Sequence, residues 1–165
     1  MNKNNDIWMM ATLLNGISLS MILPLLAPLI RLLKISELQA GLMVSASALL
    51  MSLTAMWISK KPNLQNHYYL LSIGFIGMSI TWGLFSGVLS YGLMYSMPIG
   101  LLFTLLLLTR SSIGFFMAMP QIALQSYVMT RYLDETIRSK KMASFGALNS
   151  VGLILGPFLT TLLII

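Results

Sequence analysis

The chain has 165 residues, of which 57 % are apolar and only 8 % are charged. A soluble domain carries about 25 % charged residues, so this chain has too little charge to cover a water-facing surface. It contains no cysteine, which excludes disulfides and cysteine-bound metals. The net charge of +6 comes from short basic clusters between apolar runs. That arrangement is typical of loops at an anionic membrane surface and does not indicate nucleic-acid binding.

Five apolar stretches are each long enough to cross a bilayer, which takes about 20 mostly apolar helical residues. Pro24 and Pro28 predict a kink in the second half of the first stretch. Ser36, with Gln39 three residues later, predicts the N-cap of the second. Residues 130–141 are predicted to form the longest polar loop. The sequence therefore predicts an all-α membrane protein, one membrane domain over 1–165, with spans at 7–33, 36–59, 68–90, 99–129 and 142–165.

Basic residues predict how the spans are oriented. The N-terminal tail and the loops after the second and fourth spans carry most of the lysines and arginines, whereas Arg31 and Lys34 lie on the opposite side. Cytoplasmic loops carry an excess of Lys and Arg, so we expect the N-terminus in the cytoplasm. Trp8, like other aromatic residues near span ends, is expected to anchor the chain at the membrane interface. His67 is expected to be a solvated loop residue.

Small residues follow one face of the second span at helical spacing. Such residues let two helices approach closely, and we expect this face to pack within the chain rather than against a second copy. The face consists of Gly41, Ser45, Ala48, Ser52, Ala55 and Ser59.

Polar residues inside the spans are the candidates for a functional site. An arginine inside a span costs ~2.5–3.5 kcal/mol on insertion scales. We therefore expect Arg110 to face the bundle interior or an aqueous cavity, or else to snorkel to the interface. Asn15 and the glutamines of the fourth span either line a cavity or form hydrogen bonds between helices. One stripe of the fourth span carries Arg110, Gly114, Ala118, Gln121 and Gln125.

The order of several motifs resembles the major facilitator superfamily. Arg110, Gly114 and Pro120 resemble the fourth-helix motif of that family, and Arg138 stands where its next loop has an arginine. Residues 152–157, Gly-Leu-Ile-Leu-Gly-Pro, look like its fifth-helix antiporter motif. Residues 37–41, Glu-Leu-Gln-Ala-Gly, resemble the start of the second helix in drug:proton antiporters. The resemblance covers essentially the whole chain.

The resemblance implies roles for these residues. Arg110 would lie at a central cavity and influence proton release from a nearby carboxyl. Gly152, Gly156 and Pro157 would act as a hinge or seal between outward and inward states, since the proline lacks a backbone donor and glycines allow close packing. The residues assigned to the transport motif and cavity are Arg110, Gly114, Pro120, Gln121, Gln125 and Asn15.

The chain departs from the family pattern in four ways. Residues 58–67 lack the glycine and the acid of the family's usual signature in that loop. Thr160 and Thr161 stand where the antiporter motif continues with paired glycines. The family has two six-helix halves, so five helices are expected to be an incomplete N-terminal half. No proton carrier is visible within the predicted spans, because the acidic residues are Asp6, Glu37, Asp134 and Glu135.

The resemblance implies transmembrane transport of small molecules, as the N-terminal part of a proton-coupled antiporter that exports drug-like or siderophore-like compounds and confers multidrug resistance. The expected partners are the lipid bilayer, a small-molecule substrate, protons as coupling ion and a complementary C-terminal half. The expected location is a bacterial cytoplasmic (inner) membrane. The alternative is a truncated, transport-inactive membrane protein that acts only through helix packing or partner association.

Other classes of protein are disfavoured by the residues themselves. A dimeric small multidrug exporter is disfavoured because the first span has no acid. An enzyme is not expected, because one histidine supplies neither a metal site nor an acid–base cluster. No cofactor, metal or nucleic acid is predicted.

Overall fold

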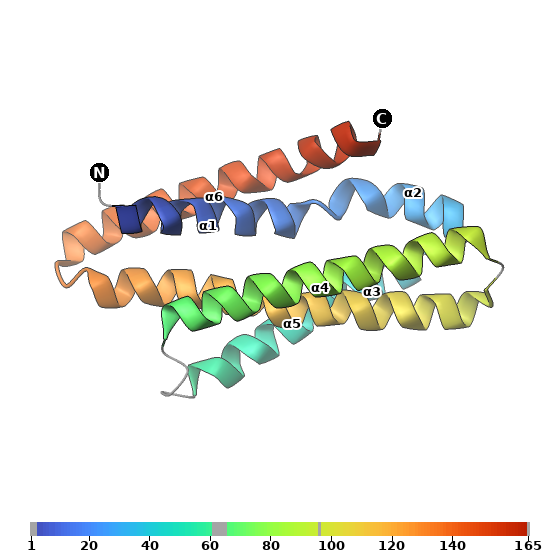
Figure 1. Ribbon diagram of the computed structural model, residues 1–165, viewed down its shortest axis with the longest axis horizontal. Helices are drawn as coiled ribbons and strands as arrows, with labels where there is room; N and C mark the ends of the chain where they lie inside the picture. The colour runs from blue at the N-terminus through green and yellow to red at the C-terminus, as the bar shows by residue number, and fades with distance from the viewer. Residues whose placement is uncertain (1–2, 61–65, 96, 165) are drawn as a thin grey trace.

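A computed structural model describes residues 3–60, 66–95 and 97–164. Within these residues the chain forms helices joined by short connections, without strands. Five stretches are long and apolar enough to cross a membrane, which confirms the predicted all-helical fold with five spans. The helices, shown in Figure 1, are α1 (Lys3–Ser20), α2 (Leu23–Leu33), α3 (Glu37–Ser59), α4 (His67–Met94), α5 (Ile99–Arg131) and α6 (Glu135–Ile164).

The first predicted span is divided into two helices. α1 ends at Ser20, and α2 begins after a two-residue turn. Pro24 accounts for the break, because it has no N–H to donate to the Ser20 carbonyl and its ring would collide with that carbonyl. The Leu25 amide donates to the Ile22 carbonyl at 3.0 Å, and not to the Met21 carbonyl as in a continuous α-helix. The single kinked helix expected over residues 7–33 is therefore corrected to two helices.

The polar segment expected as a loop over residues 130–141 is mostly helical. Only residues 132–134 separate α5 from α6. The Asp134 carboxylate accepts hydrogen bonds from the amides of Thr136 at 2.8 Å and Ile137 at 3.1 Å, and so caps the start of α6. The length of an apolar stretch predicts only the part of a helix that lies within lipid. Both helices continue past their apolar stretches into polar sequence. Arg138, expected in this loop, therefore lies near the start of α6.

A side chain caps the N-terminus of α3 and another caps the N-terminus of α4. At α3 the predicted capping box is confirmed, because the Gln39 amide donates to Ser36 Oγ at 3.2 Å and the Ser36 amide donates to Gln39 Oε1 at 2.8 Å. At α4 the Asn66 side chain accepts from the Tyr69 amide at 3.4 Å. Most of the polar loop between α3 and α4, residues 61–65, lies outside the described residues.

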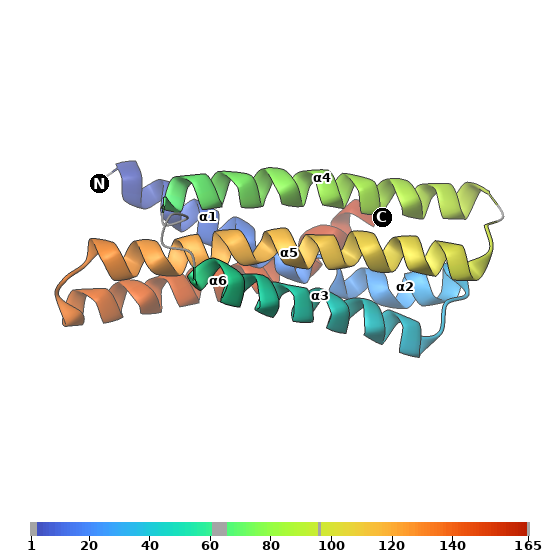
Figure 2. The same cartoon turned by 90° about the horizontal axis from the view of Figure 1, so that it is seen from below.

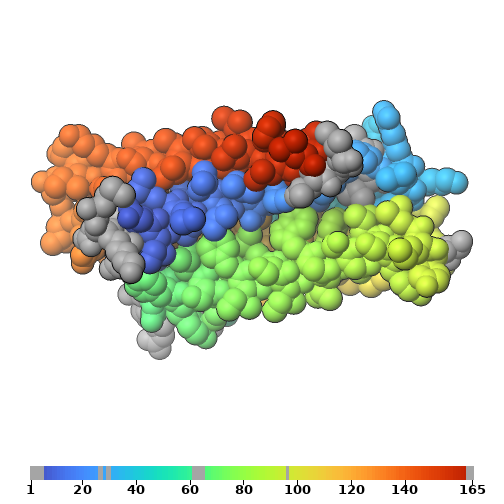
Figure 3. Space-filling model, turned by 45° about the horizontal axis from the view of Figure 1, so that its top comes forward, coloured from blue at the N-terminus to red at the C-terminus, as the bar shows by residue number. Residues whose placement is uncertain are grey.

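The helices form two packed groups. α1 lies along α6, and α5 packs against both α3 and α4, as Figures 1 and 2 show. α1 also contacts α5, whereas α5 and α6 make few contacts with each other. On one face of the molecule α1 lies between α6 and α4 (Figure 3). The start of α1, the end of α3, the start of α4 and the connection from α5 to α6 lie at one end of the molecule (Figure 1). We call it the basic end because these segments carry Lys60, Arg131, Lys140 and Lys141.

The small-residue face of α3 points away from the rest of the chain. Gly41, Ser45, Ala48 and Ser52 are exposed, and a Cβ built at Gly41 meets no atom within 4 Å. α3 instead packs against α5 through its opposite face, which includes buried Ser47. The expectation that the small residues pack within the chain is therefore wrong for the residues that the structure describes. Lipid and protein interiors are equally apolar, so spacing identifies a face without identifying its neighbour.

Candidate functional site

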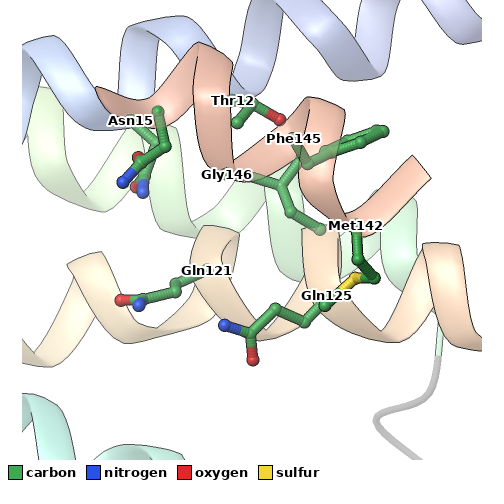
Figure 4. A pocket seen from close by; sticks show the side chains of 9 residues that line it. Thr12, Asn15, Gln121, Gln125, Met142, Phe145 and Gly146 are labelled. Carbon is green, nitrogen blue, oxygen red and sulfur yellow. The ribbon is translucent and has the colours of Figure 1, made fainter. Parts of the chain in front are cut away.

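A cavity of about 150 Å³ lies between α1, α5 and α6, in the half of the bundle nearer the basic end (Figure 4). It exists because α1 packs along α6 while α5 packs against α3 and α4, which leaves α5 and α6 apart. Its walls combine amide, hydroxyl and apolar side chains. The nine lining residues are Thr12, Asn15, Gln121, Leu124, Gln125, Met142, Phe145, Gly146 and Asn149.

The polar groups of the cavity are incompletely hydrogen-bonded within the protein. Asn15 is only 3 % exposed, and its Oδ1 atom is buried without a partner. The Oε1 atom of Gln121 is also buried without a partner. The Thr12 hydroxyl donates to the Trp8 carbonyl at 2.8 Å, so it can offer a ligand only its lone pairs. Buried polar groups usually have partners, and two such oxygens at one cavity indicate a site that accepts donors from a ligand or from water.

Three of the predicted site residues meet at this cavity. Asn15 comes from α1, and Gln121 and Gln125 come from successive turns of α5. The residues of α6 that line the cavity, most notably Asn149, were not among the predicted site residues. An amide within an apolar span was the signal that could have identified Asn149, as it did for Asn15.

Arg110 lies elsewhere in α5. It is eleven residues before Gln121, which places it about 16 Å away along the helix axis at 1.5 Å per residue. Its side chain is 6 % exposed, and its guanidinium carbon lies 5.7 Å from the centroid of the Trp82 ring of α4. Its Nε and Nη1 atoms are buried without a hydrogen-bond partner. The side chain therefore faces the bundle interior and does not snorkel.

Two other residues of the fourth-helix motif form helix contacts. A Cβ at Gly114 would overlap the Ser47 carbonyl, so this glycine lets α5 approach the α3 backbone. The Pro120 ring packs against Gly74 of α4, where a side chain would collide with it. Neither residue lines the cavity. They fix the position of α5, which in turn carries the cavity glutamines.

The antiporter-like motif forms a close contact between α6 and α1. A Cβ at Gly152 would overlap the Leu13 carbonyl, and one at Gly156 would overlap the Ser20 hydroxyl and crowd the Ile17 carbonyl. The Ser20 hydroxyl lies 3.4 Å from the Gly152 carbonyl, to which it can donate. α6 remains helical through Pro157, although the proline has no N–H for the preceding turn.

Thr160 has a specific role next to this contact. The break between α1 and α2 deprives the Met21 carbonyl of its helical partner, because the Leu25 amide bonds to Ile22. The Thr160 hydroxyl lies 3.1 Å from the Met21 carbonyl and 2.9 Å from the Gly156 carbonyl, and it can donate to either. A hydroxyl where the family has a glycine thus satisfies a backbone oxygen that the break exposes. Thr161 is exposed and bonds only to Pro157 of its own helix among the described contacts.

An aromatic cluster joins α1, α4 and α5 at the basic end, and it consists of Trp8, His67, Tyr68 and Tyr127. Trp8 is 0 % exposed and stacks on Tyr127, with ring centroids 4.0 Å apart. The His67 ring stands edge-on to both, and its Nε2 atom lies 3.0 Å from the Thr130 hydroxyl. The expectations of an interfacial Trp8 and a solvated His67 are therefore both corrected. Their position near helix ends did not reveal that three ends converge.

Truncating Trp8 should destabilise the whole bundle. We expect Trp8→Ala to lower the free energy of unfolding by about 3–5 kcal/mol, because it removes a buried ring and leaves a cavity beneath three helices. Denaturant unfolding of the purified chain in micelles, followed by circular dichroism, measures the change. Tyr69→Ala is the matched control, since Tyr69 is 54 % exposed. Equal losses in the two variants would contradict a structural role for the cluster.

Comparison with known protein families agrees with this architecture. The family profile described as Major Facilitator Superfamily matches residues 8–165, which include nearly all of the five membrane-crossing stretches and all of the residues that line the cavity. No match to a curated protein or to a solved structure was found. The profile match extends over nearly the entire chain, and the chain is therefore an integral membrane protein that belongs to the Major Facilitator Superfamily, a family of transmembrane transporters.

Proposed function

We propose that the chain is the N-terminal part of a proton-coupled exporter of drug-like or siderophore-like small molecules, and that its cavity is part of the substrate site. The observation that carries the proposal is Asn15. It is almost wholly buried in a membrane bundle, yet its carbonyl oxygen has no protein partner. Polar groups inside a membrane are costly and commonly mark substrate pathways.

The location of the cavity supports a route to the cytoplasm. It lies in the half of the bundle that holds the start of α1, the end of α5 with Arg131, and the start of α6 with Lys140 and Lys141. By the positive-inside rule we expect that end to face the cytoplasm, and we propose a bacterial inner membrane as the location. An exporter needs to collect its substrate from that side.

Coupling to protons is proposed to involve Arg110 and a carboxyl that comes from outside this chain. Asp6, Glu37, Asp134 and Glu135 are exposed at or near the ends of helices, and none lines the cavity. The Arg110 guanidinium is buried, and two of its nitrogens, Nε and Nη1, have no hydrogen-bond partner. Such a positive charge lowers the pKa of any carboxyl that approaches it. A carboxyl that moves toward and away from Arg110 would therefore release and bind a proton.

A complementary C-terminal half is the proposed source of that carboxyl. The small-residue face of α3, with exposed Gly41, Ser45 and Ala48, offers a surface that another helix can approach closely. In this proposal the antiporter-like motif at Gly152, Gly156 and Pro157 bends as the two halves rock about the midplane.

Replacing Asn15 tests the proposal. We expect Asn15→Leu, introduced at the native chromosomal locus, to raise the intracellular level of at least one exported compound to the level seen in a deletion strain. The leucine removes both hydrogen-bonding groups at similar volume. Radiolabelled drug accumulation and comparison of small molecules in the culture medium measure the effect, with and without a protonophore.

Ser79→Leu is the matched control, because Ser79 lies on the exposed face of α4. It should export like the wild type. If the wild-type and deletion strains accumulate and secrete the same compounds, the export proposal is wrong and a transport-inactive membrane protein is favoured. If a protonophore leaves export unchanged, the proton coupling is wrong.

A further inference from the structure

We infer that the cavity between α1, α5 and α6 selects uncharged ligands that both donate and accept hydrogen bonds, and that it excludes organic cations and anions. The inference rests on the proposed function, because it names the class of substrate that this same site takes. It depends on three properties of the cavity: its lack of charge, its amide groups and its apolar walls.

Charge is absent from the cavity wall. The nine lining residues, all within the described part of the chain, include neither acids nor bases. Lys141 precedes the lining residue Met142, but its ammonium group lies 5.9 Å from the centroid of the Tyr132 ring, which does not line the cavity. The cavity is partly open, with Gln125 and Gly146 exposed at its edge. An ion that enters it loses part of its hydration without gaining an opposite charge, whereas an uncharged molecule bears less of that cost.

Amides dominate the polar part of the wall. Asn15, Gln121, Gln125 and Asn149 each present one carbonyl oxygen and one NH₂ group, whichever way the amide is turned. Thr12 adds an acceptor, because its hydrogen is already donated to Trp8. A ligand with both donors and acceptors satisfies this set, and a purely apolar one leaves the buried oxygens unpaired.

The size and the apolar walls define the rest of the ligand. A dry cavity of about 150 Å³ in another protein accommodates benzene, so this cavity suits a ring-sized group. Leu124, Met142 and Phe145 supply apolar contacts for such a ring. The part of a substrate that the cavity holds is therefore an uncharged aromatic or similarly sized group that bears an amide or hydroxyl.

Three probes of nearly equal shape separate charge from size. Benzamide is uncharged, benzamidinium is a cation and benzoate is an anion. We expect saturation-transfer NMR titrations with the purified full chain in lipid nanodiscs, at about pH 8, to show benzamide binding at least tenfold more tightly than either ion. Asn15→Leu should weaken benzamide binding about tenfold, the value of one lost hydrogen bond, and Ser79→Leu should not.

A variant that introduces a negative charge into the cavity provides a second measurement. Gln121→Glu places a carboxylate in the cavity, and we expect it to improve benzamidinium binding at least tenfold while benzamide binding falls. Tighter Asn15-dependent binding of benzamidinium or benzoate to the wild type would overturn the uncharged class but keep the cavity as the substrate site. Absence of Asn15-dependent binding by all three probes would overturn both the ligand class and the site, whereas the export proposal is decided separately by the chromosomal variants.

Discussion

Arg110→Met should abolish export while leaving the stability of the bundle unchanged or slightly higher. An arginine within a span costs ~2.5–3.5 kcal/mol on insertion scales. Its contact with the Trp82 ring returns about 0.5–2 kcal/mol. The cost of burying the arginine exceeds the gain from its contact with Trp82. Methionine retains much of the apolar part of the arginine side chain. A residue that destabilises the fold in this way is retained for function, so its removal should affect transport alone.

Arg110→Lys sharpens this experiment. Lysine retains the charge but loses the planar group that lies over Trp82, so we expect partial export. Arg31→Met is the control, because Arg31 is exposed in α2. Export is measured by drug accumulation in the native host, and stability by thermal unfolding in micelles. Wild-type export by Arg110→Met would remove Arg110 from the transport mechanism, and a large loss of stability would make its role structural.

Gly156→Leu should separate α6 from α1 and stop export. The new side chain would overlap the Ser20 hydroxyl, which can rotate away, and would crowd the Ile17 carbonyl, which cannot move without moving α1. Overpacking of this kind costs about 1–3 kcal/mol. The shift of α6 would also displace Asn149 from the cavity wall. Thermal unfolding and the accumulation assay measure the two effects.

Gly83→Leu is the matched control for this substitution. A Cβ at Gly83 meets no atom within 4 Å, so leucine there should improve helix propensity by up to about 1 kcal/mol and leave export unchanged. Pro157→Ala separates packing from bending. It keeps the glycine contact but restores an N–H to the preceding turn, so stability should hold while transport slows. Unchanged transport in both Gly156→Leu and Pro157→Ala would exclude the hinge.

Much of the site could be predicted from residue types alone. Asn15, Gln121 and Gln125 stand out because amides are rare within apolar spans, and all three line the cavity. Arg110 stands out for the same reason, but its stripe on α5 did not reveal that it lies away from the cavity, beside Trp82. One face of a helix as long as α5 contacts different neighbours along its length, so residues that share this face need not share a site.

The residues that sequence patterns misplaced share a physical cause. Trp8 and His67 sit near helix ends, where exposure is usual, but three helix ends converge there, so Trp8 is buried and His67 is half-buried. The small-residue face that begins at Gly41 has the spacing of a packing surface, yet it is exposed in this chain. Each case depends on which helices become neighbours, and this information is not local to any segment.

Residue types and their spacing were enough to predict five membrane-spanning stretches, the start of most of them, and the resemblance to the Major Facilitator Superfamily. These properties depend on short segments of the chain. Examples are the transfer of an apolar stretch into lipid, the cap at Ser36 and the helix break at Pro24. The packing of the helices shows which faces meet, and this packing brings the amides of α1, α5 and α6 around one cavity. Lipid tails are as apolar as a neighbouring helix, so within a bilayer close backbone approach selects the packed face, and hydrophobic pattern does not.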